Sequence, residues 1–130
     1  MSQPSIQIEE RWPIVWVRYH AVPTDEEVEH VLSAYERYMR TRADYGIAIV
    51  TNLRHRAAQA RRMGQWMKEN HTHYEGRLKA MAFVSTSALL RFGLSTVFLI
   101  QPLTVPYAVV STEAEAAEFL LSHTSSRAAS

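Results

Sequence analysis

The segment Gly46-Ile47-Ala48-Ile49-Val50 decides the fold of this 130-residue chain. The run is short and apolar, and turn-forming residues bound it on both sides. Such a run is typical of a strand that lies in the middle of a sheet with both of its faces buried. Strands of this kind belong to parallel sheets that helices cover, so the segment predicts an α/β protein.

Upstream of this strand, the sequence predicts a β-hairpin and an amphipathic helix. Residues 6–9 alternate between apolar and polar, residues 14–19 are β-branched or aromatic, and residues 11–13 form the turn between them. Thr24 and Glu27 have the spacing of a capping box at the start of the helix. The residues expected on its inner face, at helical spacing, are Val28, Val31, Leu32, Tyr35 and Met39.

Downstream of the strand, helices and strands alternate to the end of the chain. The predicted elements are a helix over residues 57 to about 70, a strand over 79–84, a helix over 88 to about 100, a strand over 107–110 and a closing helix that Thr112 caps. The order ββαβαβαβα predicts a mainly parallel or mixed sheet with an N-terminal β-hairpin, covered by about four helices. We expect a single domain whose core spans residues 6–121, followed by a flexible tail over 122–130.

Composition excludes several classes of function. The 14 Lys and Arg residues against 13 Asp and Glu give a net charge of +1, which favours no nucleic-acid partner. The absence of cysteine excludes disulfide scaffolds, thiolate metal sites and cysteine nucleophiles. The N-terminus has no secretory signal, and the longest apolar stretch is shorter than the roughly 20 residues that cross a bilayer. We therefore expect a cytoplasmic protein with no membrane span.

No motif in the sequence points to catalysis or to a bound cofactor. The four glycines lie far apart, so they cannot form a phosphate-binding loop, and there is no Gly-x-Ser-x-Gly elbow. His71 and His73 form a His-x-His pair, but residues two apart do not share a helix face. No cysteine or carboxylate cluster joins them as further metal ligands. We expect no enzyme activity, no cofactor and no metal.

Three segments of the chain carry a family resemblance. Residues 47–54 form a strand that runs into a loop, residues 79–84 precede an apolar helix containing Arg91, and residues 105–110 precede the closing helix over 113–120. Across residues 6–121 the chain resembles the STAS domain family, in particular its SpoIIAA-like (STAS/SEC14-like) group. The resemblance implies a non-enzymatic protein–protein interaction module in a bacterial regulatory or scaffolding assembly. Relatives of this kind include anti-sigma-factor antagonists, whose partners are kinases.

One feature of those antagonists is missing from this chain. Their strand ends in Asp-Leu-Ser, and a phosphorylatable serine begins the next helix. Here Asn52 occupies the position of the aspartate, and residues 53–60 contain no serine or threonine. Because a phosphate switch needs an acceptor hydroxyl at that site, the serine-phosphorylation cycle does not carry over to this chain.

A basic segment surrounds the following helix. Between residues 53 and 79 there are seven Lys and Arg residues against two glutamates. A basic edge beside this loop can dock an acidic partner helix or a phosphate, whereas the alternative is an ordinary solvated helix face. The candidate partner-binding residues are Asn52, Arg54, His55, Arg56, Arg61 and Arg62.

The helix over residues 88–100 has more apolar side chains than one buried face requires. Arg91 and Ser95 form its clear polar strip. We expect a second copy of the chain to bury the excess, which gives a homodimer. Two alternatives are that residues 97–100 are extended or lie in the core, and that the protein is a small carrier of a lipid or another apolar ligand. The candidate residues for self-association or ligand binding are Leu90, Arg91, Leu94, Val97 and Phe98.

Overall fold

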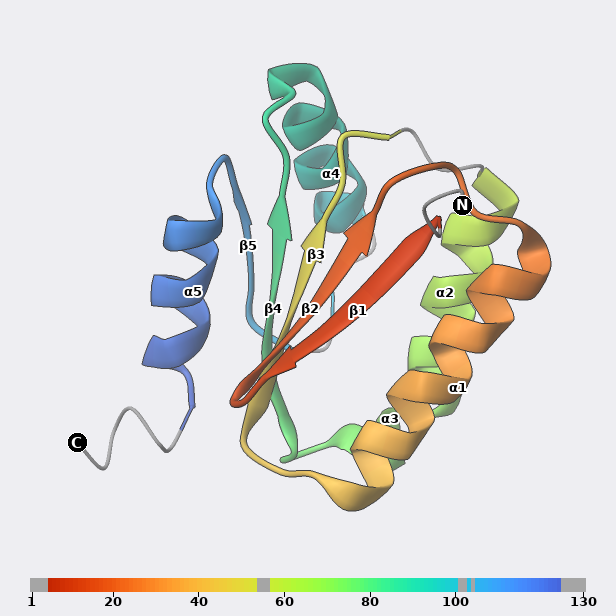
Figure 1. Cartoon of the computed structure of the whole chain (residues 1–130), viewed down its shortest axis with the longest axis vertical. Coiled ribbons are helices and arrows are strands. Elements are labelled where there is room, and N and C mark those ends of the chain that lie inside the picture. Colours follow the sequence, from red (N-terminus) through yellow and green to blue (C-terminus); the bar gives the residue numbers. More distant parts are fainter. Residues whose placement is uncertain (1–4, 54–56, 101–102, 104, 125–130) are drawn as a thin grey trace.

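The computed structural model describes residues 5–53, 57–100, 103 and 105–124, apart from the side chains of Met39, Ala57 and His73. The chain forms one five-stranded sheet with helices on both faces (Figure 1). The strands are β1 (Ile6–Arg11), β2 (Ile14–Tyr19), β3 (Tyr45–Val50), β4 (Leu78–Val84) and β5 (Tyr107–Val110). The helices are α1 (Asp25–Thr41), α2 (Ala57–Glu69), α3 (His71–Tyr74), α4 (Ala88–Ile100) and α5 (Glu113–Ser122).

The predicted order ββαβαβαβα is confirmed, with the single-turn helix α3 added between α2 and β4. The strands lie in the order β1-β2-β3-β4-β5, so every strand pairs with the one before it in the chain. The pair β1 and β2 is antiparallel and forms the predicted hairpin, and the other three pairs are parallel. Because parallel crossovers share one handedness, the connecting helices α1, α2 and α4 pack against the same face of the sheet.

The two faces of the sheet are covered by different helices. The face under α1, α2 and α4 carries large residues such as Val17, Ile47 and Phe83. The opposite face, on which α5 packs (Figure 1), carries three alanines on β3 and β4 beside larger residues: Ala48, Ala80 and Ala82 with Ile14, Trp16 and Val84. Small side chains allow α5 to approach the strands closely, and Leu120 of α5 is completely buried against them.

Helix α1 begins as the sequence predicts. The Thr24 hydroxyl accepts a hydrogen bond from the Glu27 backbone N–H at 3.1 Å, and the Glu27 carboxylate accepts one from the Thr24 backbone N–H at 2.9 Å. This capping box satisfies two N–H groups at the helix start, and it holds the pKa of the Glu27 carboxyl below its usual value. The predicted inner-face residues Val28, Val31, Leu32 and Tyr35 are buried.

The end of the chain departs from the expected boundary. The flexible tail was expected to begin at residue 122, but α5 continues to Ser122, and the His123 backbone N–H donates to the Leu120 carbonyl. Thr124 is buried, and its hydroxyl donates to the Leu121 carbonyl at 3.2 Å. Residues 122–124 therefore belong to the packed domain, and residues 125–130 of the predicted tail lie outside the described residues.

No helix in the described part of the chain combines the length and the apolar character that crossing a bilayer needs. The longest, α1, has 17 residues and an acidic first turn.

The close approach of α5 gives a test of this packing. A Cβ atom added at Gly46 would lie 2.9 Å from Leu120 Cδ2 and 3.2 Å from Leu120 Cβ. Gly46→Ala should therefore lower the free energy of unfolding by about 1–3 kcal/mol, measured by urea denaturation. The control is Gly64→Ala in α2, where nothing lies within 4 Å of the added atom. That change should raise stability by about 0.5–1 kcal/mol, and equal effects of the two changes would contradict the packing of α5.

Candidate functional site

Asn52 lies just after β3 and joins the ends of two strands. Its side-chain oxygen Oδ1 accepts a hydrogen bond from the Ser85 hydroxyl at 2.8 Å and another from the Thr86 backbone N–H at 2.9 Å. Ser85 follows β4 and is buried. The predicted partner-binding residue Asn52 therefore uses its amide oxygen to hold the carboxyl ends of β3 and β4 together.

The same junction anchors the start of α4. Arg91 Nη1 donates to the Ser85 carbonyl at 2.7 Å, and the Ser85 hydroxyl accepts from the Ser87 backbone N–H at 3.1 Å. The Ser87 hydroxyl in turn accepts from the Leu90 backbone N–H at 3.2 Å and so caps the helix. The one charged side chain of α4 is thus turned toward the sheet end, where it forms a hydrogen bond with the Ser85 carbonyl.

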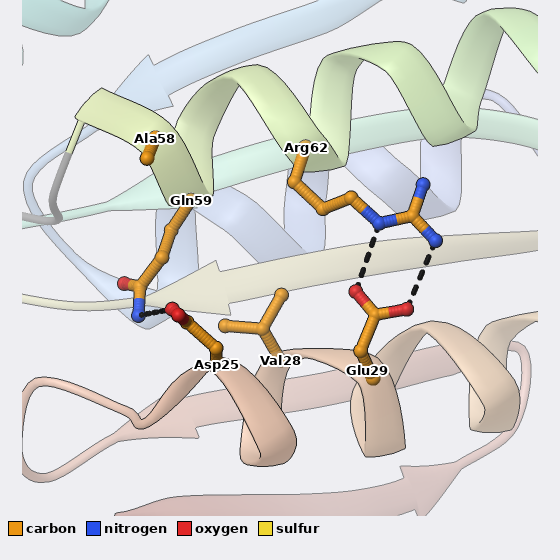
Figure 2. A pocket seen from close by; sticks show the side chains of 6 residues that line it. All are labelled: Asp25, Val28, Glu29, Ala58, Gln59 and Arg62. Atoms are coloured by element: carbon orange, nitrogen blue, oxygen red, sulfur yellow. Dashed lines mark hydrogen bonds and ion pairs between the residues drawn. The ribbon is translucent and has the colours of Figure 1, made fainter.

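The arginines of α2 have different surroundings. Arg62 makes two hydrogen bonds to the Glu29 carboxylate of α1, at 2.8 and 2.9 Å (Figure 2). This contact lowers the pKa of Glu29 and raises the pKa of Arg62. Arg61 is exposed, and Arg54, His55 and Arg56 lie outside the described residues. Of the predicted basic edge, Arg62 is therefore already paired with the chain's own α1.

A cavity of about 260 Å³ lies between α1 and α2. Its walls are Asp25, Val28, Glu29, Ala58, Gln59 and Arg62 (Figure 2). Gln59 is buried, and its Nε2 donates to the Pro23 carbonyl at 2.8 Å and to Asp25 Oδ1 at 3.2 Å. These polar contacts join the two helices and the segment before α1. They give the cavity a structural role.

Sequence reasoning did not single out Gln59. It shares one side of α2 with Met63 and Trp66, at spacings of four and three residues. Met63 packs against the core and Trp66 is buried in it. This position on the apolar side of the helix is the signal that could have identified Gln59. A glutamine there is expected to be buried, and a buried amide needs hydrogen-bond partners.

Helix α4 lies over the sheet edge near β5, and none of its residues is buried. Its inner side packs through Leu94 and Phe98. The Phe98 ring lies 4.8 Å from the ring of Phe83 and 4.8 Å from that of Tyr107, measured between centroids. Leu90 is half-buried.

The outer side of α4 is strongly apolar. Its large side chains have exposed fractions between 51% and 82%. We call this set the exposed α4 face: Leu89, Phe92, Val97, Leu99 and Ile100. The helix runs without interruption through Ile100, so residues 97–100 are helical and not extended.

Five residues of this helix were expected to mediate association, and Val97 is the one that lies on the exposed α4 face. The structure instead turns Leu94 and Phe98 toward the sheet and directs Arg91 to Ser85. Leu89, Phe92, Leu99 and Ile100 take the outward positions. The helical spacing gives the relative positions of these side chains, but the side that meets the sheet depends on tertiary contacts.

Apart from the ion pair between α1 and α2, the shifted pKa values among the described residues belong to groups at helix starts and in the core. Hydroxyl groups of Ser111 and Thr112 lower the pKa of the Glu115 carboxyl, which supports the start of α5. Burial raises the pKa of Tyr19 and of Tyr45 to about 12. These shifts lead away from neutral pH, where acid–base catalysts operate. Within the described side chains, no three histidine or acidic residues gather as metal ligands.

No protein-family model matches this chain, and no curated protein is significantly similar to it. The resemblance to the STAS family therefore remains a prediction from the residues quoted for it. Two features distinguish this site from an ordinary helix and loop. They are the hydrogen-bonded junction at Ser85 and the exposed α4 face.

The junction can be tested at Asn52. Asn52→Ala removes an oxygen that accepts from the buried Ser85 hydroxyl and from Thr86, so it should lower the free energy of unfolding by about 1–2 kcal/mol. Asn52→Asp is the control, because a carboxylate oxygen can accept both hydrogen bonds. It should retain most of the stability in chemical denaturation at neutral pH. An equal loss in both variants would mean that the acceptor at this position is not what holds the junction.

Proposed function

We propose that this chain is a non-catalytic, STAS-like interaction module that self-associates through the exposed α4 face and acts in a regulatory or scaffolding assembly. The observation that carries the proposal is the exposure of that face. Burying one Leu or Phe side chain is worth about 1.5–3 kcal/mol, and these side chains remain in water in the isolated chain. A contiguous apolar patch of this kind marks an interaction site.

The absence of charge on the exposed α4 face favours a second copy as its occupant. Arg91 is the one charged residue of α4, and its guanidinium bonds to the Ser85 carbonyl on the inner side. Two identical faces can therefore meet around a two-fold axis without like-charge repulsion. Such isologous pairing is the commonest arrangement of homo-oligomers.

Gly93 also favours a second copy of the chain as the partner of the exposed α4 face. It lies inside α4, and nothing lies within 4 Å of the position that a Cβ atom would take. Glycine within a helix costs roughly 0.5–1 kcal/mol relative to alanine, and no contact with the described residues accounts for it here, as is also the case for Gly64 in α2. At the surface of the exposed α4 face, Gly93 leaves the backbone open to the close approach of another helix.

The alternative function, a small carrier of an apolar ligand, has less support than self-association. A ligand held between α4 and the sheet needs space there, but Phe98 fills that region between the rings of Phe83 and Tyr107. The exposed side chains point outward from a convex helix surface. Flat or convex apolar faces suit another protein surface better than a small molecule, which prefers concave sites.

The central prediction concerns Phe92 and Leu99. The double change Phe92→Glu with Leu99→Glu should give a folded monomer where the parent chain is a dimer, because two carboxylates per copy would be buried without partners. Sedimentation velocity over a concentration series, together with circular dichroism, measures both properties. The matched control is Ala60→Glu with Gln65→Glu, which places the same charges on exposed positions of α2 and should leave the dimer intact.

Three results would count against the proposal. A parent chain that is monomeric at all concentrations would exclude self-association. A dimer that persists in the Phe92 and Leu99 variant would place the interface elsewhere. Bound mass that is detected by native mass spectrometry and lost on denaturation would favour the carrier.

Gly93 provides a finer test of the helix pairing. Gly93→Ala should raise the helical stability of the single chain but weaken dimerisation at least about fivefold, since a methyl group would enter a close contact. The dimer dissociation constant from sedimentation equilibrium measures the effect. Gly64→Ala, at an exposed position of α2, should leave that constant unchanged. A tighter dimer in Gly93→Ala would show that the two helices do not cross at this residue.

A further inference from the structure

A group of aromatic and arginine side chains lies at the end of the sheet where β2, β3 and β4 begin, the lower end in Figure 1. It draws on the β1–β2 turn, the end of α1 and the segment before β4. Backbone hydrogen bonds join these segments, from Tyr45 N–H to the Arg77 carbonyl at 3.2 Å and from Gly46 N–H to the Pro13 carbonyl at 2.9 Å. We call this group the arginine–aromatic cluster: Trp12, Tyr38, Tyr45, Arg37, Arg42 and Arg77.

The rings form the base of the cluster. The Trp12 ring meets the rings of Tyr38 and Tyr45 edge to face, each at 5.8 Å between centroids. Both tyrosines are buried, whereas 37% of Trp12 is exposed. The rings therefore form a firm apolar support with the indole at its surface.

The arginines lie on this base. The Arg42 guanidinium carbon is 4.6 Å from the centroid of Trp12, and that of Arg37 is 5.7 Å from the centroid of Tyr38. Arg77 Nη1 donates to the Arg42 carbonyl at 3.4 Å. Contact with a ring face leaves the N–H groups at the edge of a guanidinium free to donate. All three arginines are exposed.

Neighbouring carboxylates are already engaged. Glu36 pairs with Arg40 at 2.7 Å, Asp44 pairs with Lys79 at 3.6 Å, and Glu9 pairs with Arg11 at 2.6 Å. Glu10 and Arg37 both form side-chain hydrogen bonds with Tyr38. Among the described residues, no ion pair involves Arg37, Arg42 or Arg77. In the described part of the chain these three guanidinium groups therefore have no ion-paired carboxylate, and the single Glu10 charge beside Tyr38 offsets only part of their positive charge.

We propose that the arginine–aromatic cluster is a second interaction surface, which binds an acidic segment of a partner protein. Guanidinium groups match carboxylates in geometry and form charge-assisted hydrogen bonds with them. Three exposed arginines from two parts of the chain suit a segment with several acidic side chains better than a single small anion. The surface is separate from the exposed α4 face and does not depend on self-association.

Single-stranded nucleic acid fits the surface less well. Its binding relies on ring faces on which bases can stack. Here Tyr38 and Tyr45 are buried, and Arg42 covers a face of Trp12. The net charge of +1 also provides little general attraction for a polyanion.

The experiment titrates the whole chain with an acetylated hexaglutamate peptide at low ionic strength. The change in fluorescence is expected from Trp12, since Trp16 and Trp66 are buried and a bound peptide would not contact them. Saturable binding is expected, weakened at least about tenfold in Arg77→Gln and in Arg37→Gln. Arg40→Gln is the matched control, because it removes the same charge from the end of α1 but from a residue paired with Glu36. Its effect should stay below about threefold.

Each other outcome overturns the proposal. If hexaglutamate gives no saturable signal, the arginine–aromatic cluster does not bind acidic segments. If Arg40→Gln weakens hexaglutamate binding as much as the other two changes do, the binding is due to general electrostatic attraction and not to the cluster. Tighter binding of hexathymidylate than of hexaglutamate assigns the surface to nucleic acid, and saturation by pyrophosphate at lower concentration assigns it to a small phosphate ligand. Dimerisation, measured in parallel, should not respond to any of the arginine changes.

Discussion

The structure depends on one constraint, the strictly sequential pairing of its strands. Each parallel strand lies beside the one before it, so the crossover helices α1, α2 and α4 all gather on one face of the sheet. The helix that follows the last strand, α5, then has the other face to itself. Because α4 makes the last crossover, it lies over the sheet edge. Its inner side is covered by the sheet, while its outer side has no neighbouring helix within the described chain.

Much of the fold is readable from the sequence because its signals are local. The capping box at Thr24 and Glu27 lies within one helical turn, and the buried strand around Ile47 follows from its own composition. The packed domain extends beyond the predicted boundary at residue 121, because Thr124 is buried in the folded structure although the segment around it is small and polar. Local patterns cannot show such burial.

The candidate sites were less predictable, and the reasons differ from one to the next. In α4 both sides are apolar, so periodicity alone does not tell whether Phe98 or Phe92 meets the sheet. The inward turn of Arg91 depends on the Ser85 carbonyl, which belongs to the segment before the helix. The arginine–aromatic cluster draws Trp12, Arg42 and Arg77 from three separate segments. Side chains so far apart in sequence meet only when the sheet aligns them.

The junction at Ser85 has a consequence for recognition. Hydrogen bonds from Arg91 and to the Ser87 hydroxyl hold the start of α4 in place. Near its other end, the Phe98 ring packs against the rings of Phe83 and Tyr107. The helix therefore cannot roll about its own axis without losing these contacts. The orientation of the exposed α4 face is therefore already fixed in the single chain. The helix has little rotational freedom that association could remove. In the proposed dimer, this preorganisation would reduce the conformational entropy lost on association and so raise the affinity.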